Sequence, residues 1–444
     1  MAWVSRASSL DGVNGSFSIV EAPVPDPQPG SIVIKQELCG ICGTDVHVYQ
    51  GHMKVPAPVV LGHEIVGRIV GLGDGVAVDS TGRAIKEGDL LGIKPGISNN
   101  DEFFGSIAHQ PNLSPGFGAY GFAAANLTKQ LPLPVTGGYA SYQWIVPGTK
   151  VYRMPGETAA DVAAASILEP LSVGIHAAGR ATYRFGDTVV IQGAGPIGLM
   201  CLVGAKELGA FKTIVIGAPA DRLAFARELG ADLTIDITEV RDPEERAAMV
   251  REASGHGQGA DIVIEATGVL AALPEGFNLL RRGGQYVTCG HFTNVGDIPL
   301  NPFGRCTFKH ITLYGVWASA HEHFVQARQL IESKKYPLEK FVSHQMTGEG
   351  GGEKGERGRR PRRTRSSRRT MRRRRGGTKE DEKEPPRIQR ARGRMREGRG
   401  YHPAPFSPLS TLHSPRLGVL GVLAVQSYRA HCGMGFACWG TPGR

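Results

Sequence analysis

The stretch TVVIQGAGPIGLM, residues 188 to 200, indicates the fold of the second half of the chain. The apolar run TVVIQ leads directly into the glycine-rich turn GAGPIG, and from residue 196 to 208 apolar residues recur at helical spacing. A buried strand, a glycine turn and a helix in this order are typical of a unit that binds a dinucleotide. A bare G-x-G-x-x-G motif would be weak evidence, but its place between a strand and a helix strengthens it here.

The three glycines of this turn have different predicted tasks. Gly193 permits the tight turn, Gly195 lets a pyrophosphate approach the backbone, and Gly198 allows the helix to pack close to the strand. The N-terminus of the helix then offers its free N–H groups to the phosphates. The residues predicted to contact the cofactor are Gly193, Gly195, Pro196, Ile197, Gly198, Arg222 and Gly268.

Strands and helices continue to alternate beyond this unit. Further buried apolar runs that predict strands are residues 213–218, 233–237, 261–266, 285–289 and 311–317. Because helical patterns separate the first of these runs, they predict an α/β domain in which a doubly wound parallel sheet has helices on both faces.

The sequence leaves the choice between NAD and NADP open. Enzymes that prefer NAD place Asp or Glu about twenty residues beyond the glycine turn, where the carboxylate holds the ribose 2′-hydroxyl. That place is near Gly217 here, and no acid follows until Asp221. Arg222 is predicted to contact the adenosine ribose or a phosphate on it; the alternative is that it only covers an exposed helix surface.

Residues 1 to about 150 show a different pattern. Short β segments such as residues 31–38, 66–70 and 139–146 are broken by Gly and Pro, and no long helical period appears before residue 159. This pattern predicts a small, irregular β-barrel.

Three further motifs bring together residue types that bind metals. They are CGICGTDVH (residues 39–47), LGHE (61–64) and LEPLSVG (168–174). Cys42, His63 and a carboxylate suit zinc, which keeps one position open in a catalytic site. Alone, the CxxC pair of Cys39 and Cys42 would also fit a redox pair or half a zinc ribbon, but no second CxxC follows. Cys39 is therefore interpreted as a small buried core residue.

In their order along the chain, these motifs resemble those of the zinc-containing medium-chain dehydrogenase/reductase superfamily, to which the alcohol dehydrogenases belong. The nearest resemblance is to the sorbitol (polyol) and threonine dehydrogenase branch. It extends from about residue 20 to about residue 346 and rests on CGICGTD, GHE, GGYASY, LEPLSVG, GAGPIG and ELGAD. It implies a GroES-like β-barrel catalytic domain and a Rossmann cofactor domain.

The same resemblance implies a set of zinc ligands. Cys42, rather than Cys39, would bind zinc together with His63. Glu64 would be a direct or exchanging ligand. Glu169 stands where the alcohol dehydrogenases place a cysteine ligand, and in the polyol branch it acts through water. The predicted metal ligands are thus Cys42, His63, Glu64 and Glu169.

Residues around the predicted metal site also receive roles from the resemblance. Asp45 would orient the histidine ligand, with a simple turn aspartate as the alternative. Thr44 and His47 match positions of a proton relay, and the alternative for His47 is a solvent-facing side chain. Tyr49 and Phe292 are candidate pocket residues, or only packing residues. The predicted catalytic residues are Thr44, His47 and Glu64.

Family members often carry a second, structural zinc held by four closely spaced cysteines. The matching region, residues 94–138, contains no cysteine. We therefore expect one catalytic zinc and no structural zinc, with NAD or NADP as the second cofactor. The expected reaction is reversible hydride transfer between NAD(P) and a primary or secondary alcohol, polyols included.

The positive charge of the chain is concentrated in one segment. The formal net charge is +10, but residues 351–400 hold 21 Lys and Arg against 7 Asp and Glu. The other 394 residues, with 30 basic and 34 acidic groups, have a net charge of −4. Since the basic segment has no aromatic and few aliphatic residues, we expect residues 349–444 to form a low-complexity, disordered or aberrant tail.

This tail begins where a family member would continue with further catalytic-domain residues. A frameshift, an unspliced intron or a mispredicted gene model would produce such a change, and the loss would put activity in doubt. The alternative function is an inactive dehydrogenase scaffold whose basic tail binds RNA or another anionic surface. A zinc-free quinone or enoyl reductase would not explain the predicted metal ligands.

The domains, partners and compartment follow from these patterns. The predicted domains are residues 1–170 (GroES-like), 171–318 (Rossmann), 319–348 (a truncated return to the catalytic domain) and 349–444 (tail). Seven irregularly spaced cysteines, no signal peptide and no span for a bilayer predict a cytoplasmic protein without membrane contacts. The expected partners are a small alcohol or carbonyl substrate and further copies of the chain, in a dimer or tetramer joined through residues 311–317; nucleic acid is expected only if the tail is genuine.

Overall fold

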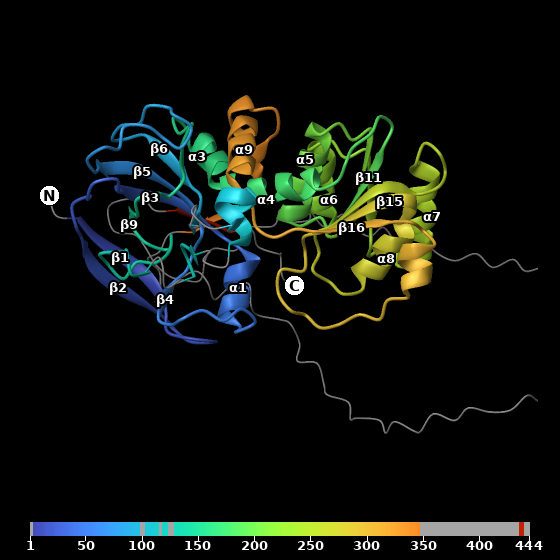
Figure 1. The fold of residues 1–444 in the computed structure, drawn as a ribbon, viewed down its shortest axis with the longest axis horizontal. Helices are drawn as coiled ribbons and strands as arrows, with labels where there is room; N and C mark the ends of the chain where they lie inside the picture. The colour runs from blue at the N-terminus through green and yellow to red at the C-terminus, as the bar shows by residue number, and fades with distance from the viewer. Residues whose placement is uncertain (1–2, 98–102, 115–117, 123–127, 347–434, 439–444) are drawn as a thin grey trace, which may run out of the picture. The chain divides into compact units, whose positions relative to one another are not determined.

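The computed structural model describes residues 3–97, 103–114, 118–122, 128–346 and 435–438 (Figure 1). These residues all belong to one of the two units into which the chain divides. The other unit, residues 352–420, lies outside the described residues, and so does most of the predicted tail.

The predicted parallel sheet is confirmed. Its six strands have the order β13-β12-β11-β14-β15-β16 and all pairs are parallel, which is the doubly wound order of a Rossmann fold. The strands are β11 (Thr188–Gln192), β12 (Lys212–Gly217), β13 (Leu233–Asp236), β14 (Ala260–Glu265), β15 (Leu280–Thr288) and β16 (Thr312–Gly315). The helices between them are α5 (Pro196–Glu207), α6 (Ala220–Glu228), α7 (Pro243–Ala253) and α8 (Ala272–Leu279), with the short turn η3 (Phe303–Thr307) before β16.

Both faces of this sheet are covered (Figure 1). Side chains alternate along β11: Val189 and Ile191 pack on one face, in a core that includes α5, while Val190 packs on the other, in a core with residues of α7 and α8. This explains why TVVIQ is a continuous apolar run rather than an alternating one.

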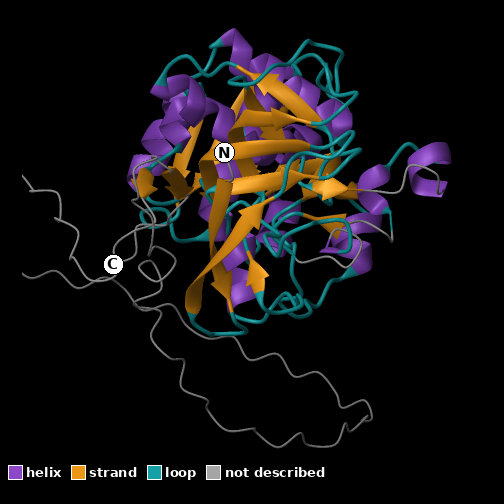
Figure 2. Cartoon of the chain, turned by 90° about the vertical axis from the view of Figure 1, so that its left-hand side faces the viewer, coloured by secondary structure: helices purple, strands orange, loops and turns teal. Residues whose placement is uncertain are grey.

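The first part of the chain forms the predicted irregular β structure. Figure 2 shows the chain from this side. The main sheet has the order β10-β6-β5-β3-β18-β17, with β9 also paired to β3, and β2-β1-β4 and β7-β8 form two smaller sheets. The strands are β1 (Trp3–Leu10), β2 (Phe17–Val24), β3 (Ile32–Ile41), β4 (Val59–Val60), β5 (Glu64–Leu72), β6 (Leu90–Ile93), β7 (Gly96–Ile97), β8 (Gly118–Ala119), β9 (Tyr142–Ile145) and β10 (Val151–Met154).

Short helices connect these strands and lead to the Rossmann sheet. They are α1 (Gly43–Tyr49), η1 (Phe103–Ile107), η2 (Pro111–Leu113), α3 (Ala159–Ser166) and α4 (Leu168–Gly179). Among the described residues no single helix is long and apolar enough to cross a membrane; only α3 and α4 taken together, bent by 47°, reach the required length and composition.

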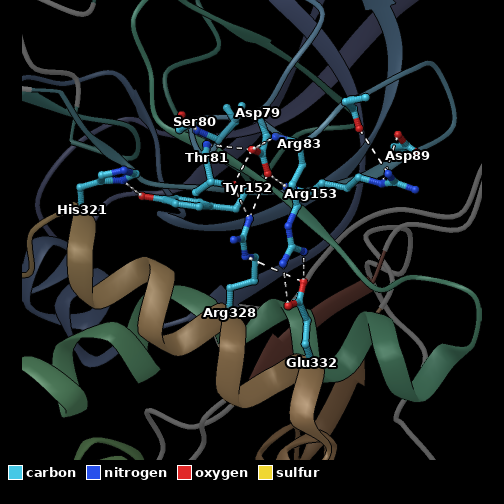
Figure 3. Close-up of polar contacts among 12 residues, drawn as sticks. Asp79, Ser80, Thr81, Arg83, Asp89, Tyr152, Arg153, His321, Arg328 and Glu332 are labelled. Atoms are coloured by element: carbon cyan, nitrogen blue, oxygen red, sulfur yellow. Dashed lines mark hydrogen bonds and ion pairs between the residues drawn. The ribbon is translucent and has the colours of Figure 1, made fainter.

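After β16 the chain returns to the β-rich part. The returning elements are α9 (His321–Ser333), η4 (Leu338–Phe341) and β17 (His344–Met346). Ion pairs fix α9 in place: Arg328 binds Asp79 at 3.1 Å, both side chains being buried, and Arg83 pairs with Glu332 (Figure 3).

The C-terminal segment differs from the predicted tail at four residues. Gly435–Cys438 form strand β18, which lies between β3 and β17 in the main sheet. It pairs in parallel with residues 38–41 of β3 and antiparallel with β17. The prediction of disorder for the rest of residues 349–444 falls outside the described residues.

Candidate zinc and dinucleotide site

Three of the four predicted metal ligands converge. Cys42 directly follows β3 and caps the N-terminus of α1, while His63 and Glu64 stand where β5 begins. One ligand atom from each lies within 4.8 Å of the other two. His63 and Glu64 are buried, and Cys42 is partly buried. A thiol, an imidazole and a carboxylate thus share one small volume, although more than twenty residues separate the two segments.

Close strand pairing places the carboxylate of this group. Gly40 on β3 pairs with Glu64 on β5. A Cβ atom added to Gly40 would lie 1.6 Å from Oε2 of Glu64. Any side chain at position 40 would therefore displace the carboxylate. Gly40 of the CGICG motif therefore belongs to the site, because only glycine leaves room for the Glu64 carboxylate.

Asp45 connects the metal group to its surroundings. Its Oδ2 accepts hydrogen bonds from the backbone N–H of Cys42 at 2.9 Å and from the hydroxyl of Tyr139 at 3.0 Å. Its Oδ1 lies 3.6 Å from Nδ1 of His63. This contact supports the predicted role of Asp45 in orienting the histidine. Tyr139 had no predicted role, since only the fold brings it to Asp45.

The charges of the group are strongly coupled. Burial alone would lower the pKa of His63, but the Asp45 carboxylate and the Cys42 sulfur raise it well above its usual value. Burial raises the pKa of the Cys42 thiol, and the nearby His63 opposes that shift. The pKa values of the thiol and the imidazole are therefore linked, and a bound cation would favour the deprotonated form of each.

Glu169, the fourth predicted ligand, is not part of the group of three. It is partly buried in the first turn of α4. Burial raises its pKa, while the charges of His63 and Lys94 lower it. Its charge is thus coupled to the site without direct contact, and its role as a ligand through water stays a prediction.

Lys94 is a buried cation near the site that the motifs did not indicate. Its ammonium donates a hydrogen bond to the carbonyl of Gly96 at 2.8 Å. Burial lowers its pKa to about 8, a shift that the charge of Glu169 opposes. No sequence signal marked Lys94, because a lone lysine in a loop is usually exposed.

Thr44 and His47, the residues of the predicted proton relay, each have one polar contact, and the relay itself stays a prediction. The Cys42 thiol donates to the hydroxyl of Thr44 at 3.4 Å. His47 is partly buried, and its Nδ1 lies 3.0 Å from Nδ1 of His52. Burial and the charge of His52 lower the pKa of His47, which favours the neutral ring. His52 was not predicted and extends the possible relay by one imidazole.

Aromatic rings line the approach to this group. The ring of Phe292 meets that of His47 edge-on at 4.9 Å, and Phe122 lies 5.0 Å from His63. Tyr49 instead stacks on Phe17 at 6.2 Å, in agreement with the alternative that it is a packing residue. Because Phe292 follows β15 and His47 is in α1, the end of the parallel sheet is next to the metal-binding helix.

The glycine turn has the geometry that its motif predicts. Gly193 has a φ of +111°, which a residue with a side chain rarely adopts. A Cβ on Gly198 would lie 1.9 Å from the carbonyl oxygen of Gly193, so the helix touches the turn there. A Cβ on Gly195 would meet only Nη1 of Arg222, at 3.9 Å. The backbone at Gly195, the N-cap of α5, is thus open to a phosphate.

The structure gives a steric reason for the missing acid at the end of β12. A Cβ on Gly217 would lie 2.6 Å from the backbone nitrogen of Ala194 in the glycine turn. A carboxylate cannot fit there unless the turn moves. Arg222 is then the polar side chain closest to Gly195, and burial lowers its pKa.

A buried carboxylate network surrounds Gly268. Oε1 of Glu265 accepts hydrogen bonds from the backbone N–H groups of Thr267 and Gly268, and its Oε2 lies 2.9 Å from Nδ1 of His291. Nε2 of His291 is buried and has no hydrogen-bond partner among the described residues. The sequence did not reveal Glu265 or His291 because the pair joins the ends of two strands.

The residues present fit both expected cofactors. The donor set of the metal group is the mixture of sulfur, nitrogen and oxygen that zinc accepts. At the glycine turn, the packing of Gly193 against Gly198 and the open space at Gly195 leave room for a pyrophosphate at the N-terminus of α5.

Comparisons with known proteins agree with this geometry. Residues 28–156 match the alcohol dehydrogenase GroES-like domain, and residues 196–333 match the zinc-binding dehydrogenase family. The chain is 33% identical to 5-exo-hydroxycamphor dehydrogenase of Pseudomonas putida over 335 residues, 74% of this chain and 88% of the relative. It is 31% identical to sorbitol dehydrogenase of Ovis aries over 334 residues, 74% of this chain and 87% of the relative.

The chain belongs to the zinc-binding alcohol dehydrogenase family. Among solved structures, an alcohol dehydrogenase of Thermotoga maritima shares 34% identity and a TM-score of 0.71 over 77% of this chain and 92% of its own. A candidate zinc-binding dehydrogenase of Sinorhizobium meliloti 1021, bound to NADP, shares 26% identity and a TM-score of 0.66 over 77% of this chain and 92% of its own.

Family membership confirms the predicted class, fold and cofactors. The chain is a member of the zinc-dependent alcohol and polyol dehydrogenases, near the sorbitol dehydrogenases, with zinc and NAD(P) as cofactors. Neither matched domain includes the basic segment, and the comparisons give no support to an inactive scaffold that binds RNA.

Proposed function

We propose that this chain oxidises a secondary alcohol reversibly, with hydride transfer to NAD(P), at a single zinc held by Cys42, His63 and Glu64. The convergence of these three donor atoms within 4.8 Å carries the proposal. Bound zinc would polarise the substrate oxygen and lower the pKa of its hydroxyl. Glu169 is proposed to reach the metal through water, as its position near the coupled charges of His63 and Lys94 allows.

The chain's own residues handle orientation and the proton. Asp45, itself held by Tyr139, fixes the ring of His63. Thr44 lies against Cys42 and is placed to accept the proton that leaves the alcohol. His47, whose pKa burial lowers, is proposed to receive the proton next and to pass it toward His52, whose Nδ1 lies 3.0 Å from its own. The Phe292 ring on His47 limits the entry of water from the cofactor side.

The substrate class is proposed from two relatives and one buried charge. Two relatives are named for sorbitol, a polyol, and for 5-exo-hydroxycamphor, a cyclic secondary alcohol. Both compounds contain a hydroxyl-bearing carbon that is bonded to two other carbons. Lys94 and Glu169 add hydrogen-bonding groups beside the metal group. These groups favour a substrate with a second hydroxyl over a purely apolar alcohol.

We also infer a homodimer joined through β16. This strand is the last of the sheet and has a free edge within the described residues. Leu313 and Trp317 are 51% and 48% exposed there, and Phe308 just before the strand is 54% exposed. An exposed edge strand with large apolar side chains is a typical surface for pairing with a second copy.

The test of the zinc site compares the two cysteines of CGIC. Cys42→Ala should remove zinc, which metal analysis would find at about one per wild-type chain. It should also lower alcohol-dependent NAD(P)H formation by about a thousandfold, since zinc supplies several kcal/mol of transition-state stabilisation.

The matched control is Cys39→Ala. Cys39 is fully buried in the core and lies outside the metal group. The control should keep its zinc and lose only stability. Equal zinc content in both variants would refute the assignment of Cys42.

A further inference from the structure

A hollow of about 290 Å³ lies on the Rossmann domain, away from the cofactor turn. Its lining residues come from the end of α7, from the loop after it, from the end of α8, from the start of β15 and from the loop before β16. They are Arg251, Gln258, Asn278, Leu280, Arg281, Arg282 and Lys309. Because these segments precede strands of a parallel sheet, the hollow is at the N-terminal edge of the sheet, whereas the glycine turn is at the C-terminal edge.

Two of the lining cations have unused hydrogen-bond donors. The side chains of Arg251 and Arg282 are exposed and make no ion pair or hydrogen bond with any described residue. The Arg282 guanidinium lies 4.2 Å from the centre of the Phe308 ring, which holds it at the rim of the hollow. Each guanidinium therefore keeps its planar set of N–H donors available at the hollow that both residues line.

Two other cations form the frame of the hollow. The Lys309 ammonium donates to the carbonyl oxygens of Phe277 and Leu280 at 2.5 Å each. Arg281 is paired with the buried carboxylate of Asp261. These contacts hold the β15 and β16 segments together and fix the walls of the hollow.

The positive charge here exceeds the negative charge. Burial lowers the pKa of Lys309, and repulsion from Arg305, Arg251 and Arg282 lowers it further. The acidic groups in contact with the lining are Asp261, which Arg281 neutralises, and Glu244, which accepts a hydrogen bond from the Asn278 amide. Arg251, Arg282 and Lys309 have no carboxylate partner among the described residues.

We propose that this hollow binds a small phosphate-bearing anion through Arg251 and Arg282. A guanidinium matches the oxygens of a phosphate with two parallel hydrogen bonds, and two guanidinium groups favour a multiply charged anion over chloride. The Gln258 side chain supplies a neutral donor at the same wall. The volume suits a small molecule rather than a polymer.

The site is separate from the pyrophosphate position of the cofactor, and the experiment must keep the two apart. Inorganic phosphate also has affinity for a helix N-terminus such as that of α5. The probe is therefore inorganic phosphate, titrated by calorimetry into full-length zinc-loaded protein saturated with NADH. Potassium chloride keeps the ionic strength constant, so that general screening does not count as binding.

The decisive variant is Arg251→Gln/Arg282→Gln, which removes two charges and no internal ion pair. Phosphate should bind the wild type, and the variant should bind it at least about tenfold more weakly. The control Arg184→Gln/Arg227→Gln removes two exposed charges outside the hollow and should bind phosphate like the wild type. NADH binding and the unfolding temperature establish that each variant is folded.

Three results would overturn the proposal. The first is a wild type that gives no heat with phosphate beyond that seen with chloride alone. The second is an Arg251→Gln/Arg282→Gln variant that binds phosphate as tightly as the wild type. The third is a control that loses as much affinity as the variant, which would make the effect one of net charge. Because the readout is binding, its failure leaves the proposed dehydrogenase activity untouched.

Discussion

At the scale of single residues, the cofactor site depends on Gly217, a position that has no room for a side chain. Many dinucleotide-binding sheets place a carboxylate at this strand end to hold the ribose 2′-hydroxyl and repel a 2′-phosphate. Here the backbone of Ala194 occupies the space that such a side chain would need. The Arg222 guanidinium lies next to Gly195 and is the group predicted to meet the adenosine end of the cofactor.

This arrangement predicts a preference that Arg222 controls. Arg222→Ala should lower kcat/KM for NADP by about tenfold more than for NAD, because only NADP offers a 2′-phosphate to the guanidinium. Arg227→Ala, on the same helix but with its side chain on Thr234, is the control and should change neither value. Equal losses with the two cofactors would show that Arg222 contacts a group that NAD and NADP share.

The sequence predicted those site residues whose motifs are local. Cys42 and Thr44 stand two positions apart and His63 and Glu64 are neighbours, so short motifs hold them, and the family resemblance supplied their predicted roles. Tyr139, which contacts Asp45, and His291, which contacts Glu265, were missed because each acts across strands that only the fold brings together. Long-range partners have no fixed spacing, so a single sequence has no signal for them.

At the scale of elements, the buried ion pair between α9 and the β-rich part deserves a direct test. Arg328 and Asp79 are both buried, and Thr81 also accepts a hydrogen bond from Arg328 (Figure 3). Burial alone would raise the pKa of Asp79, but hydrogen bonds from Thr81 and from the backbone of Arg153 outweigh it and lower the pKa. The pair therefore holds an ionised carboxylate inside the protein.

Arg328→Leu should lower the free energy of unfolding by about 3–5 kcal/mol, because it leaves a buried carboxylate unpaired. Lys340→Leu removes a mostly exposed ion pair with Glu228 and should cost less than about 1 kcal/mol. Denaturant titration of both variants measures the difference. Similar small losses would mean that water reaches Asp79.

The same pair predicts an acid dependence. Since the folded state lowers the pKa of Asp79, its contribution is complete above the pKa of the unfolded carboxyl, about 4. It is lost as the pH falls through the lower folded value. Asp79→Asn should therefore unfold with a shallower dependence on pH below about 4 than the wild type. Unchanged slopes would remove Asp79 from the groups that govern acid unfolding.

The exposed edge of β16 leads to a further prediction at this scale. Leu313→Lys places a charge on the edge where a second copy would pair, and it should convert the proposed dimer into a monomer. Light scattering after size-exclusion chromatography gives the mass. Phe185→Lys, at a fully exposed loop position, is the control and should leave the mass unchanged. A wild-type monomer would end the proposal outright.

The elements themselves were the most predictable part of the structure. The strands after the glycine turn appear within a few residues of their predicted places, because buried parallel strands are continuous apolar runs. Strand β15 is the exception, since it begins at Leu280, whereas the prediction began at residue 285. Arg281, Arg282 and two glycines conceal its first half, in which Leu280 is buried in the core while the two arginines line the hollow.

At the scale of the whole molecule, part of the C-terminal segment belongs to the fold. Composition predicted that everything after residue 348 would stay outside the fold. Instead Gly435–Cys438 form a strand between β3 and β17, next to the end of β3 that leads into Cys42. Composition could not reveal this, because whether four residues form a strand depends on the strands with which they can pair.

This placement predicts opposite results for two deletions. Removing residues 435–444 uncovers the edge of β3 at residues 38–41 and takes away several backbone hydrogen bonds. We expect the unfolding temperature to fall by about 5 °C, since each lost bond is worth about 1 kcal/mol. Zinc retention should fall as well, because Cys42 directly follows the uncovered strand.

Removing residues 352–420 should be tolerated. Met346 and Phe436 are paired neighbours, so residues 347–351 and 421–434 suffice to connect β17 to β18, and a shorter loop costs less entropy to close. This deletion also removes most of the basic segment, so retained zinc and activity would separate catalysis from the tail. Calorimetry and metal analysis of both deletions decide the matter: a 435–444 deletion as stable and as zinc-loaded as the wild type would mean that β18 contributes nothing to the fold.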